Sequence, residues 1–284
     1  MSVTFQQIGY MGRLGNQMFQ FASTLGISEK LGYTPVFPLE NCFNYQGSGP
    51  FDPSIGRNMR VKCDLLDCFE ISQRYFIPER HIEILQTYSE SDFKYDKGTE
   101  SIKDGSCLYG YFQTEKYFKH IRDLIVSEFS FRSDHLKKAE NYIRSIKDKI
   151  GNSKIISLHV RRGDYVMFQD YHPTCSEGYY KSAQEEMVKN HGDAFFLVFS
   201  DDVDWCKNEF KNRNHIVCEL LDPYSEMCCM TLCDHHIIAN SSFSWWGAWL
   251  NKKENKEIIA PSRWFGPLIN KDTSDVYCDN WRIM

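Results

Sequence analysis

Two adjacent arginines at a predicted strand end are the side chains in this sequence best suited to bind an anionic ligand. Arg161 and Arg162 follow the apolar run 155–160, and Asp164 comes shortly after them. A guanidinium offers a planar pair of N–H donors, so one arginine can bind a diphosphate while the other pairs with Asp164. His159 lies two residues before Arg161 and is therefore expected on the same strand face. A surface salt bridge at a turn is the alternative interpretation.

Serines at the start of a predicted helix form a second candidate anion site. Ser241, Ser242 and Ser244 follow an apolar run at 236–239 and precede a tryptophan-rich stretch. Backbone N–H groups at a helix start, together with nearby hydroxyls, can hold a phosphate. Ordinary capping explains the same serines, and the tryptophans are predicted to pack the helix against the core.

Acidic residues follow a third predicted strand. Ser200 and Asp201 stand at the strand tip, where they are expected to meet a nucleotide base. Asp202 and Asp204 spell the Asp-x-Asp pattern that holds a divalent metal in many glycosyltransferases. Acidic side chains also favour the first turn of a helix, so the same pair is explained without a metal.

Two further clusters carry weaker signals. The turn 12–17 places backbone amides at a helix start, but it does not match G-x-G-x-x-G, the fingerprint of dinucleotide binding. Cys228, Cys229 and Cys233 precede two histidines, which invites a zinc interpretation. Their spacing lacks a paired C-x-x-C framework, so we predict buried thiols on a core helix instead.

Apolar runs alternate with helical segments throughout the second half of the chain. The predicted strands are 155–160, 195–199, 215–218, 236–239 and 257–260. This alternation is typical of βαβ units with a parallel sheet, and near-continuous apolar strands fit a sheet covered on both faces. Ligands of such sheets bind outside the carboxyl ends of the strands, where the three motifs above are expected.

The first half of the chain is less regular. A strand is predicted at 5–10, a helix at 16–31 ended by Gly32, and a charged helix at 134–149. The polar stretch 149–153 is predicted to be a linker. We therefore expect two domains, at 1–150 and 151–284.

Composition disfavours several classes of protein. The 284 residues carry a formal net charge of −5 with a pI near 6.0, unlike a nucleic-acid binder with a basic face. No apolar stretch approaches the ~20 residues that span a bilayer, and the first residues lack the features of a signal peptide. The 11 cysteines are then expected as reduced thiols in a soluble, cytoplasmic protein.

Five motifs in chain order make the sequence similar to a known family. They lie at 12–20, 110–113 with 116–117, 159–165, 199–202 and 241–250. On these motifs the chain resembles the α-1,2-fucosyltransferases of glycosyltransferase family 11. Arg13 stands where the family usually has glycine, a change predicted to narrow the acceptor cleft or alter its charge.

The resemblance implies a GT-B fold, an α/β architecture of two facing Rossmann-like domains with parallel sheets. It implies that the nucleotide sugar binds the C-terminal domain at 151–284 and that the domain at 1–150 forms the acceptor side. It implies GDP-L-fucose as donor, a galactose-containing glycan as acceptor, and inversion at the fucose carbon with transfer to the 2-hydroxyl. No metal, other cofactor, nucleic acid or membrane span is expected.

The same resemblance suggests roles for the candidate residues. Without a metal, a fixed guanidinium and a helix N-terminus must neutralise departing GDP, which gives Arg161 the pyrophosphate and Arg162 a supporting role at Asp164. Asp164 is also the leading candidate for the base that takes the acceptor proton. His159 is expected to support Arg161 or touch a phosphate, unless it is a buried structural residue. The remaining expected contacts are Ser200 and Asp201 with the nucleotide base, Ser241, Ser242 and Ser244 with the phosphates, Asp170 and His172 near the acceptor as further base candidates, and Gly15, Asn16 and Gln17 with the sugars.

Two other classes of protein fit the same residues. One is a metal-dependent glycosyltransferase with another nucleotide-sugar donor, which would use Asp202 and Asp204. The other is a non-catalytic protein that binds nucleotide or glycan. Activity that persists in excess EDTA excludes the first, and release of GDP during turnover excludes the second.

Overall fold

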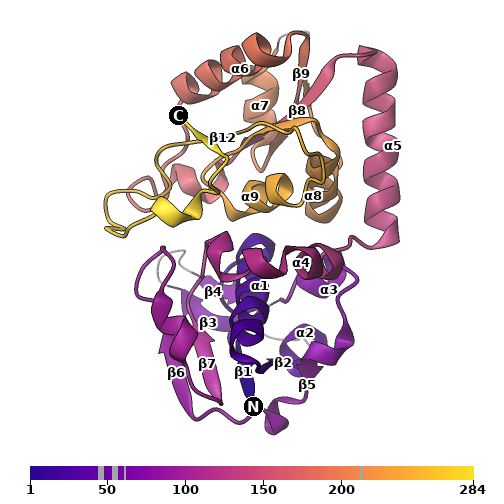
Figure 1. Ribbon diagram of the computed structural model, residues 1–284. Helices are drawn as coiled ribbons and strands as arrows, with labels where there is room; N and C mark the ends of the chain where they lie inside the picture. Colours follow the sequence, from indigo (N-terminus) through magenta and orange to yellow (C-terminus); the bar gives the residue numbers. More distant parts are fainter. Residues whose placement is uncertain (44–47, 53–56, 61, 212–213) are drawn as a thin grey trace. The chain divides into compact units, whose positions relative to one another are not determined.

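The chain divides into two compact units, each with its own sheet (Figure 1). The computed structural model describes residues 1–43, 48–52, 57–60, 62–211 and 214–284. Unit 1 comprises Met1–Arg132 and Lys271–Cys278, and unit 2 comprises Ser133–Asn270 and Asp279–Met284. The boundary expected at 150/151 therefore lies one helix too late, because helix α5 (Ser133–Ile150) packs on α8 (Pro223–Leu232) of unit 2.

Unit 1 is built on a parallel sheet with the strand order β5-β2-β1-β7-β6. Its strands are β1 (Ser2–Thr4), β2 (Thr34–Pro38), β5 (Phe76–Ile77), β6 (Gln86–Ser89) and β7 (Ser106–Tyr109). The unit also contains α1 (Leu14–Leu31), α2 (Leu39–Phe43), the antiparallel pair β3 (Ser48–Asp52) and β4 (Arg57–Arg60), α3 (Leu65–Cys68) and α4 (Arg122–Glu128).

Helix α1 is buried on nearly every face. Within residues 14–28 only Asn16 is not buried. Phe21 stacks on Phe37 with 4.9 Å between ring centroids and contacts Phe129 at 5.7 Å. Gly26 lets the following segment approach the helix, because a Cβ there would lie 2.1 Å from a backbone carbonyl oxygen. The helix thus forms the centre of the unit 1 core.

The predicted elements of the first half agree with this unit in part. The helix predicted at 16–31 is α1, and Gly32 ends it with a left-handed φ of 67°, as expected. The strand predicted at 5–10 is wrong, because the strand is Ser2–Thr4 and the next residues form a turn in which Tyr10 N–H donates to the Gln7 carbonyl. Phe5 and Ile8 after the strand are fully buried in the core, which gave the misleading apolar signal.

Unit 2 has a parallel sheet with the strand order β10-β9-β8-β11-β12-β13. The strands are β8 (Lys154–Val160), β9 (Ala194–Ser200), β10 (His215–Val217), β11 (His235–Ile237), β12 (Ile258–Ala260) and β13 (Arg282–Ile283). Besides α5 and α8, its helices include α6 (Glu177–His191), α7 (Val203–Glu209) and α9 (Ser242–Trp249). The five predicted strands are confirmed. The two parallel-sheet α/β units confirm the expected GT-B-like fold class.

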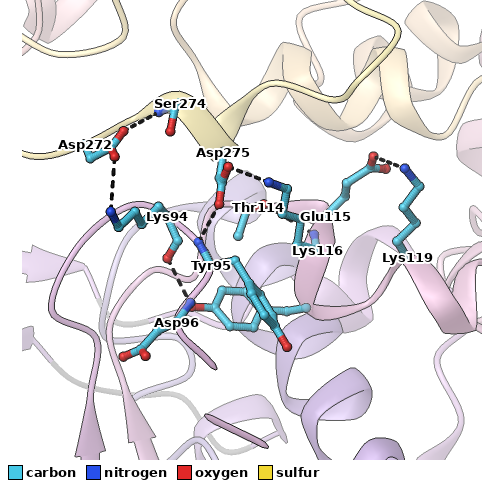
Figure 2. Close-up of polar contacts among 11 residues, drawn as sticks. Lys94, Tyr95, Asp96, Thr114, Glu115, Lys116, Lys119, Asp272, Ser274 and Asp275 are labelled. Carbon is cyan, nitrogen blue, oxygen red and sulfur yellow. Dashed lines mark hydrogen bonds and ion pairs between the residues drawn. The ribbon is translucent and has the colours of Figure 1, made fainter. Parts of the chain in front are cut away.

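A C-terminal segment, Lys271–Cys278, belongs to unit 1 although the chain on both sides of it belongs to unit 2. Figure 2 shows how acidic side chains fix it: Asp275 accepts from Lys116 Nζ at 2.6 Å and from the Tyr95 N–H at 2.9 Å. Asp272 pairs with Lys94 at 3.4 Å. Asp275 lies within a 3₁₀ turn, Ser274–Val276, and Val276 at the end of this turn is fully buried.

No helix in the described ranges is both long and apolar enough to cross a bilayer.

Several histidines of unit 2 are buried in the sheet. His236 on β11 contacts Ser157 Oγ through Nδ1 at 2.7 Å, and its Nε2 accepts from Asn251 Nδ2 at 2.8 Å. Burial lowers the pKa of His236 to about 3. Burial also lowers the pKa of His215 and of His235, each to about 4. These side chains are therefore neutral in the folded protein at neutral pH.

Acid should destabilise unit 2 through these histidines. An unfolded histidine takes up a proton near its ordinary pKa of about 6.5, whereas buried His236 does not. The stabilising contribution is therefore complete above the unfolded pKa and declines as the pH falls, by about 1.4 kcal/mol per pH unit for a fully buried histidine. Thermal melts between about pH 7.5 and 5 should show a shallower pH slope for His236→Gln than for the wild type. Identical slopes would contradict this account.

Candidate functional site

Strands β8 and β9 end side by side at the carboxyl edge of the unit 2 sheet. Val160 pairs with Ser200, so the residues that follow each strand are neighbours. Arg161 and Arg162 leave β8 at this point, and Asp201 and Asp202 leave β9. The edge therefore brings two cationic and two anionic side chains together, where open α/β sheets bind ligands.

Arg161 lies between two carboxylates. Its Nη2 is 2.5 Å from Asp164 Oδ1, and its Nη1 is 2.8 Å from Asp201 Oδ2. The side chain is only 16% exposed, and the guanidinium carbon lies 5.0 Å from the centroid of the Tyr165 ring. Gly163 makes this geometry possible, because a Cβ there would lie 2.2 Å from Asp201 Oδ2. The two ion pairs fix the plane of the guanidinium.

Arg162 has a different set of partners. Its Nε is 3.1 Å from Asp202 Oδ2, and its guanidinium carbon lies 4.0 Å from the centroid of the Trp205 ring. Its backbone N–H donates to Asp201 Oδ1 at 2.9 Å. The expectation that Arg162 orients Asp164 is therefore wrong. The 3₁₀ turn Gly163–Val166 returns the Asp164 carboxylate to Arg161.

A pocket of about 370 Å³ opens beside the two arginines. One wall is the beginning of α6, where the Ser176 side chain accepts from the Tyr179 N–H. Backbone N–H groups and the positive end of the helix dipole face this side. Glu177 also lines the pocket, so its charge is mixed rather than uniformly positive. The residues that complete the lining are Val160, Thr174, Cys175, Gly178, Tyr180 and Trp205.

The serines at the start of α9 divide into two groups. Ser244 is buried. Its hydroxyl donates to the Ser241 carbonyl at 3.3 Å and to the Ala239 carbonyl at 3.5 Å. Ser241 is also buried and occupies the N-cap without a side-chain capping bond. Ser242 is half-buried at the first residue of the helix. The geometry thus leaves Ser242 as the serine best placed for a ligand.

Asn240 fixes the turn before α9. Its Nδ2 donates to the Pro173 and Trp264 carbonyls, at 2.8 and 3.0 Å. Its backbone carbonyl accepts from Tyr165 Oη at 3.2 Å, and its Oδ1 accepts from the Cys175 thiol. One buried amide therefore joins three loops around the edge of the sheet.

Two histidines lie near Arg161 and differ in their surroundings. His159 is buried on β8 with no partner at Nδ1, and burial together with the Arg161 charge lowers its pKa to about 3. It is therefore a neutral neighbour of Arg161 at pH 7. His172 stacks on Tyr165 with 4.9 Å between centroids, and burial lowers its pKa. Asp170 is exposed in the loop before it.

The strand-tip residues next to Arg161 have defined partners. Asp201 is the carboxylate that bridges both arginines, and Ser200 Oγ accepts the Asp202 N–H at 3.0 Å. Their expected contact with a nucleotide base remains a prediction.

In unit 1, the glycine-rich turn is held by glutamine side chains. Gln17 is fully buried: its Nε2 donates to the Lys62 and Gly12 carbonyls at 2.8 and 3.3 Å, and its Oε1 accepts from the Asp64 N–H at 2.7 Å. Gly15 is buried within α1. These two residues are structural, so the expected sugar contacts at Gly15 and Gln17 do not fit the geometry. Asn16 remains accessible and is half-buried.

The sequence matches one protein family over nearly its entire length. The model of "Glycosyl transferase family 11" covers residues 3–284. This chain belongs to glycosyltransferase family 11.

Relatives with assigned names support the same placement. The Escherichia coli alpha-1,2-colitosyltransferase is 31% identical over 269 residues, which cover 89% of this chain and 90% of that protein. The E. coli O-antigen biosynthesis glycosyltransferase WbnK is 35% identical over 191 residues, 63% of this chain and 61% of that protein. The Bos taurus galactoside 2-alpha-L-fucosyltransferase SEC1 is 24% identical over 255 residues, 86% of this chain and 63% of that protein. The matches thus span less than two thirds of two of these three relatives.

Among solved structures, POFUT1 in complex with GDP-fucose is similar to this family 11 chain. The TM-score is 0.49 with 13% sequence identity, and the match covers 91% of this chain and 97% of that chain.

In this family 11 protein, residues of both proposed metal sites are engaged in other contacts or buried. Asp202 accepts the Trp205 N–H as the N-cap of α7 and pairs with Arg162. Cys228, Cys229 and Cys233 are buried thiols, as predicted, and burial raises the pKa of each. Within the described part of the chain, no three His, Cys, Asp or Glu side chains form a cluster with metal-binding geometry.

The sequence analysis missed several side chains that shape these family 11 sites. Trp205 lies three residues after Asp202, and an aromatic residue at this helical spacing from a capping aspartate was a usable signal. Asn240 lies between the predicted strand at 236–239 and the serines, and no role was assigned to it from the sequence. Glu90 in unit 1 belongs to no recognised pattern, and Gln113 lies in the motif 110–113 without an assigned role, because the partners of both residues lie far away in the sequence.

The two aspartates of the Asp-x-Asp pattern should differ in their effect on stability. Asp202→Ala removes a helix N-cap and the partner of Arg162, and should lower stability by about 1 kcal/mol or more. Asp204→Ala changes an exposed side chain and should leave the melting temperature nearly unchanged. Thermal unfolding of both variants, with and without Mg²⁺ or Mn²⁺, tests this. Equal losses that added metal accentuates would favour the metal interpretation.

Proposed function

We propose that this protein is an inverting glycosyltransferase that transfers L-fucose from GDP-L-fucose to the 2-hydroxyl of a galactose-type acceptor. The observation that carries the proposal is the Arg161 guanidinium, held between two carboxylates beside a pocket at the strand ends. Membership of family 11 supports it, as do relatives named as a colitosyltransferase and a galactoside fucosyltransferase. Because one of those names specifies colitose, GDP-colitose is the second candidate donor.

The diphosphate of the donor is proposed to bind at Arg161. A guanidinium has more N–H donors than its two carboxylate partners use, so donors remain for phosphate oxygens. Negative charge grows on the diphosphate as its bond to the sugar breaks, and a guanidinium already fixed in place stabilises that charge without reorganising. Ser242 at the start of α9 is proposed as a second phosphate contact.

Asp164 is proposed to take the proton of the acceptor hydroxyl. Its Oδ1 is held by Arg161, and the side chain is 38% exposed, so an acceptor can reach the carboxylate. The ion pair also fixes the direction of the carboxylate, which a general base requires. Neutral His172, stacked on the nearby Tyr165 ring, is the alternative base in the same cluster.

The proposed mechanism uses no metal. The Asp202 carboxylate caps α7 and pairs with Arg162, and Arg161 supplies the positive charge for the leaving group. In unit 1, Asn16 is proposed to hydrogen-bond the donor or acceptor sugar, because of the three expected sugar contacts Gly15, Asn16 and Gln17 it is the one that is not buried.

GDP should stabilise the protein specifically. A nucleotide at 100 times its dissociation constant adds about 2.7 kcal/mol to the free energy of unfolding, which a thermal shift detects. GDP should produce the shift, while fucose alone and UDP should not. An equal shift with UDP would contradict the guanine-nucleotide assignment. Transfer from GDP-fucose to a β-galactoside such as lactose, in excess EDTA, tests the reaction itself.

The two arginines should respond differently to lysine. Arg161→Lys keeps the charge but loses the planar fork, and should reduce transfer by a factor of about 10² or more. Arg162→Lys should reduce transfer less, because its guanidinium pairs with Asp202 and stacks on Trp205. Steady-state rates of GDP release check this, with thermal melts as the control for folding. Near-full activity of Arg161→Lys alongside an inactive Arg162→Lys would reverse the assignment.

A further inference from the structure

Asn16 is held by a second amide from a distant part of unit 1. Gln113 Nε2 donates to Asn16 Oδ1 at 2.9 Å, although the two residues lie 97 positions apart. Gln113 is 6% exposed, so this bond is made inside the protein rather than at its surface. Because the Asn16 carbonyl oxygen accepts from Gln113, this bond orients the carboxamide and leaves the N–H groups of Nδ2 as its donors toward a ligand.

The turn that carries Gln113 has an unusual backbone. Gly110 has a φ of 152°, and Phe112 has a φ of 52°, a left-handed conformation that is rare for a residue with a side chain. Phe112 is fully buried and contacts Tyr117 edge to face at 5.3 Å. Such a conformation persists only when its surroundings enforce it, and strained turns concentrate at functional sites.

Glu90 supplies the enforcing contacts. Its carboxylate accepts the Tyr111 N–H at 2.7 Å and the Phe112 N–H at 2.9 Å. Gly110 is required for this approach, because a Cβ there would lie 2.4 Å from Glu90 Cβ and 2.7 Å from Glu90 Oε2. Glu90 directly follows β6, and the turn directly follows the neighbouring strand β7. The Glu90 carboxylate, at the end of β6, therefore fixes the backbone that follows β7.

Gln20 joins the same turn to the glycine-rich motif. Its fully buried Nε2 donates to the Met11 carbonyl at 3.1 Å and lies 3.5 Å from the Gly110 carbonyl. The turn at 110–113 and the turn at 9–13 are thus parts of one hydrogen-bonded assembly.

We propose that Glu90 and Gln113 are positioning residues that hold the Asn16 carboxamide with its N–H donors toward the sugar substrate. The inference rests on the proposed function, since it assigns to Asn16 a sugar hydroxyl or ring oxygen as ligand. Glu90 acts through the strained turn, and Gln113 acts through its direct bond. Neither residue needs to touch the substrate.

The charge state of Glu90 gives this arrangement a pH dependence. Burial raises the pKa of Glu90 to about 7, with smaller contributions from Asp92 and Asp96, while the two backbone N–H groups oppose the shift. Tyr117 also lies close enough for the Glu90 charge to add to the increase that burial causes in its pKa. Above its pKa the carboxylate accepts both N–H bonds; below it, the protonated group cannot accept both equally. Positioning should therefore weaken as the pH falls through about 7.

Kinetics of two test variants and two matched control variants test the proposal. Gln113→Ala and Glu90→Gln should each lower kcat/KM for the galactoside acceptor by about tenfold to a hundredfold, the scale of a small misplacement. GDP affinity measured by calorimetry should stay unchanged. One control is Asn41→Ala, which removes the hydrogen bond from a buried side-chain amide to the Gln6 carbonyl. The other is Glu128→Gln, which changes a buried carboxylate that accepts the Ser72 N–H. Both controls should keep kcat/KM.

The pH profile separates positioning from simple destabilisation. The wild type and Glu128→Gln should lose acceptor kcat/KM as the pH falls through about 7, and Glu90→Gln should lack this decline. Equal losses in the controls, or an unchanged acid limb in Glu90→Gln, would overturn the proposal.

A measurement without substrate distinguishes this inference from the proposed function. In NMR spectra of the wild type, the Asn16 side-chain NH₂ signals should shift with a midpoint near pH 7, and Glu90→Gln should abolish that titration. An Asn16 signal that is insensitive to both pH and Gln113→Ala would refute the positioning role. Failure of the wild type to transfer fucose, with the titration intact, would instead refute only the proposed function.

Discussion

One guanidinium held by two carboxylates joins the ends of β8 and β9, and the site in unit 2 is arranged around it. A charge as enclosed as that of Arg161 requires charged or hydrogen-bonding partners, and Asp164 and Asp201 supply them. The approach of Asp201 in turn requires a glycine at 163. Arg162 then turns the other way, onto Asp202 and the Trp205 ring. The fold therefore fixes the guanidinium in advance, and in the proposed function this group stabilises the diphosphate without reorganising.

In unit 1, neutral side-chain amides rather than charged groups hold the candidate site residue in place. Gln17 and Gln20 are both fully buried and bind backbone carbonyls of the glycine-rich turn, so the motif is mostly internal scaffolding. Asn16 is the member that remains accessible, and Gln113 occupies its carbonyl oxygen. A buried amide without partners costs free energy, so these bonds keep the turn in a single conformation. The motif therefore combines one accessible amide with the side chains that orient it.

The fold was more predictable than the site. The strands of unit 2 are continuous apolar runs, which is why β8 and β9 were found from sequence, whereas β13 has only two residues and was not. The predicted domain boundary lies one helix too late because α5 is highly charged and buries only a narrow face of Ala139, Ile143 and Ile146, so little in the sequence indicated that it packs on unit 2. In the site, the strand-end position of Arg161 was predictable, but its partners depended on a 3₁₀ turn that spacing does not reveal. Gln17 and Glu90 show the same limit, since their partners lie far away in the sequence.

In the proposed site, Arg161 binds the diphosphate in the orientation that its ion pair with Asp201 fixes. Calorimetric GDP affinities of the wild type, Arg161→Ala, Asp201→Asn and the double variant test it directly, because a double-mutant cycle measures their coupling. Asp201→Asn is expected to weaken GDP binding in the wild type and to have a much smaller effect once Arg161 is removed, because its orienting role is then lost. Additive losses in the double variant would show that the two residues contact GDP independently and would contradict the account.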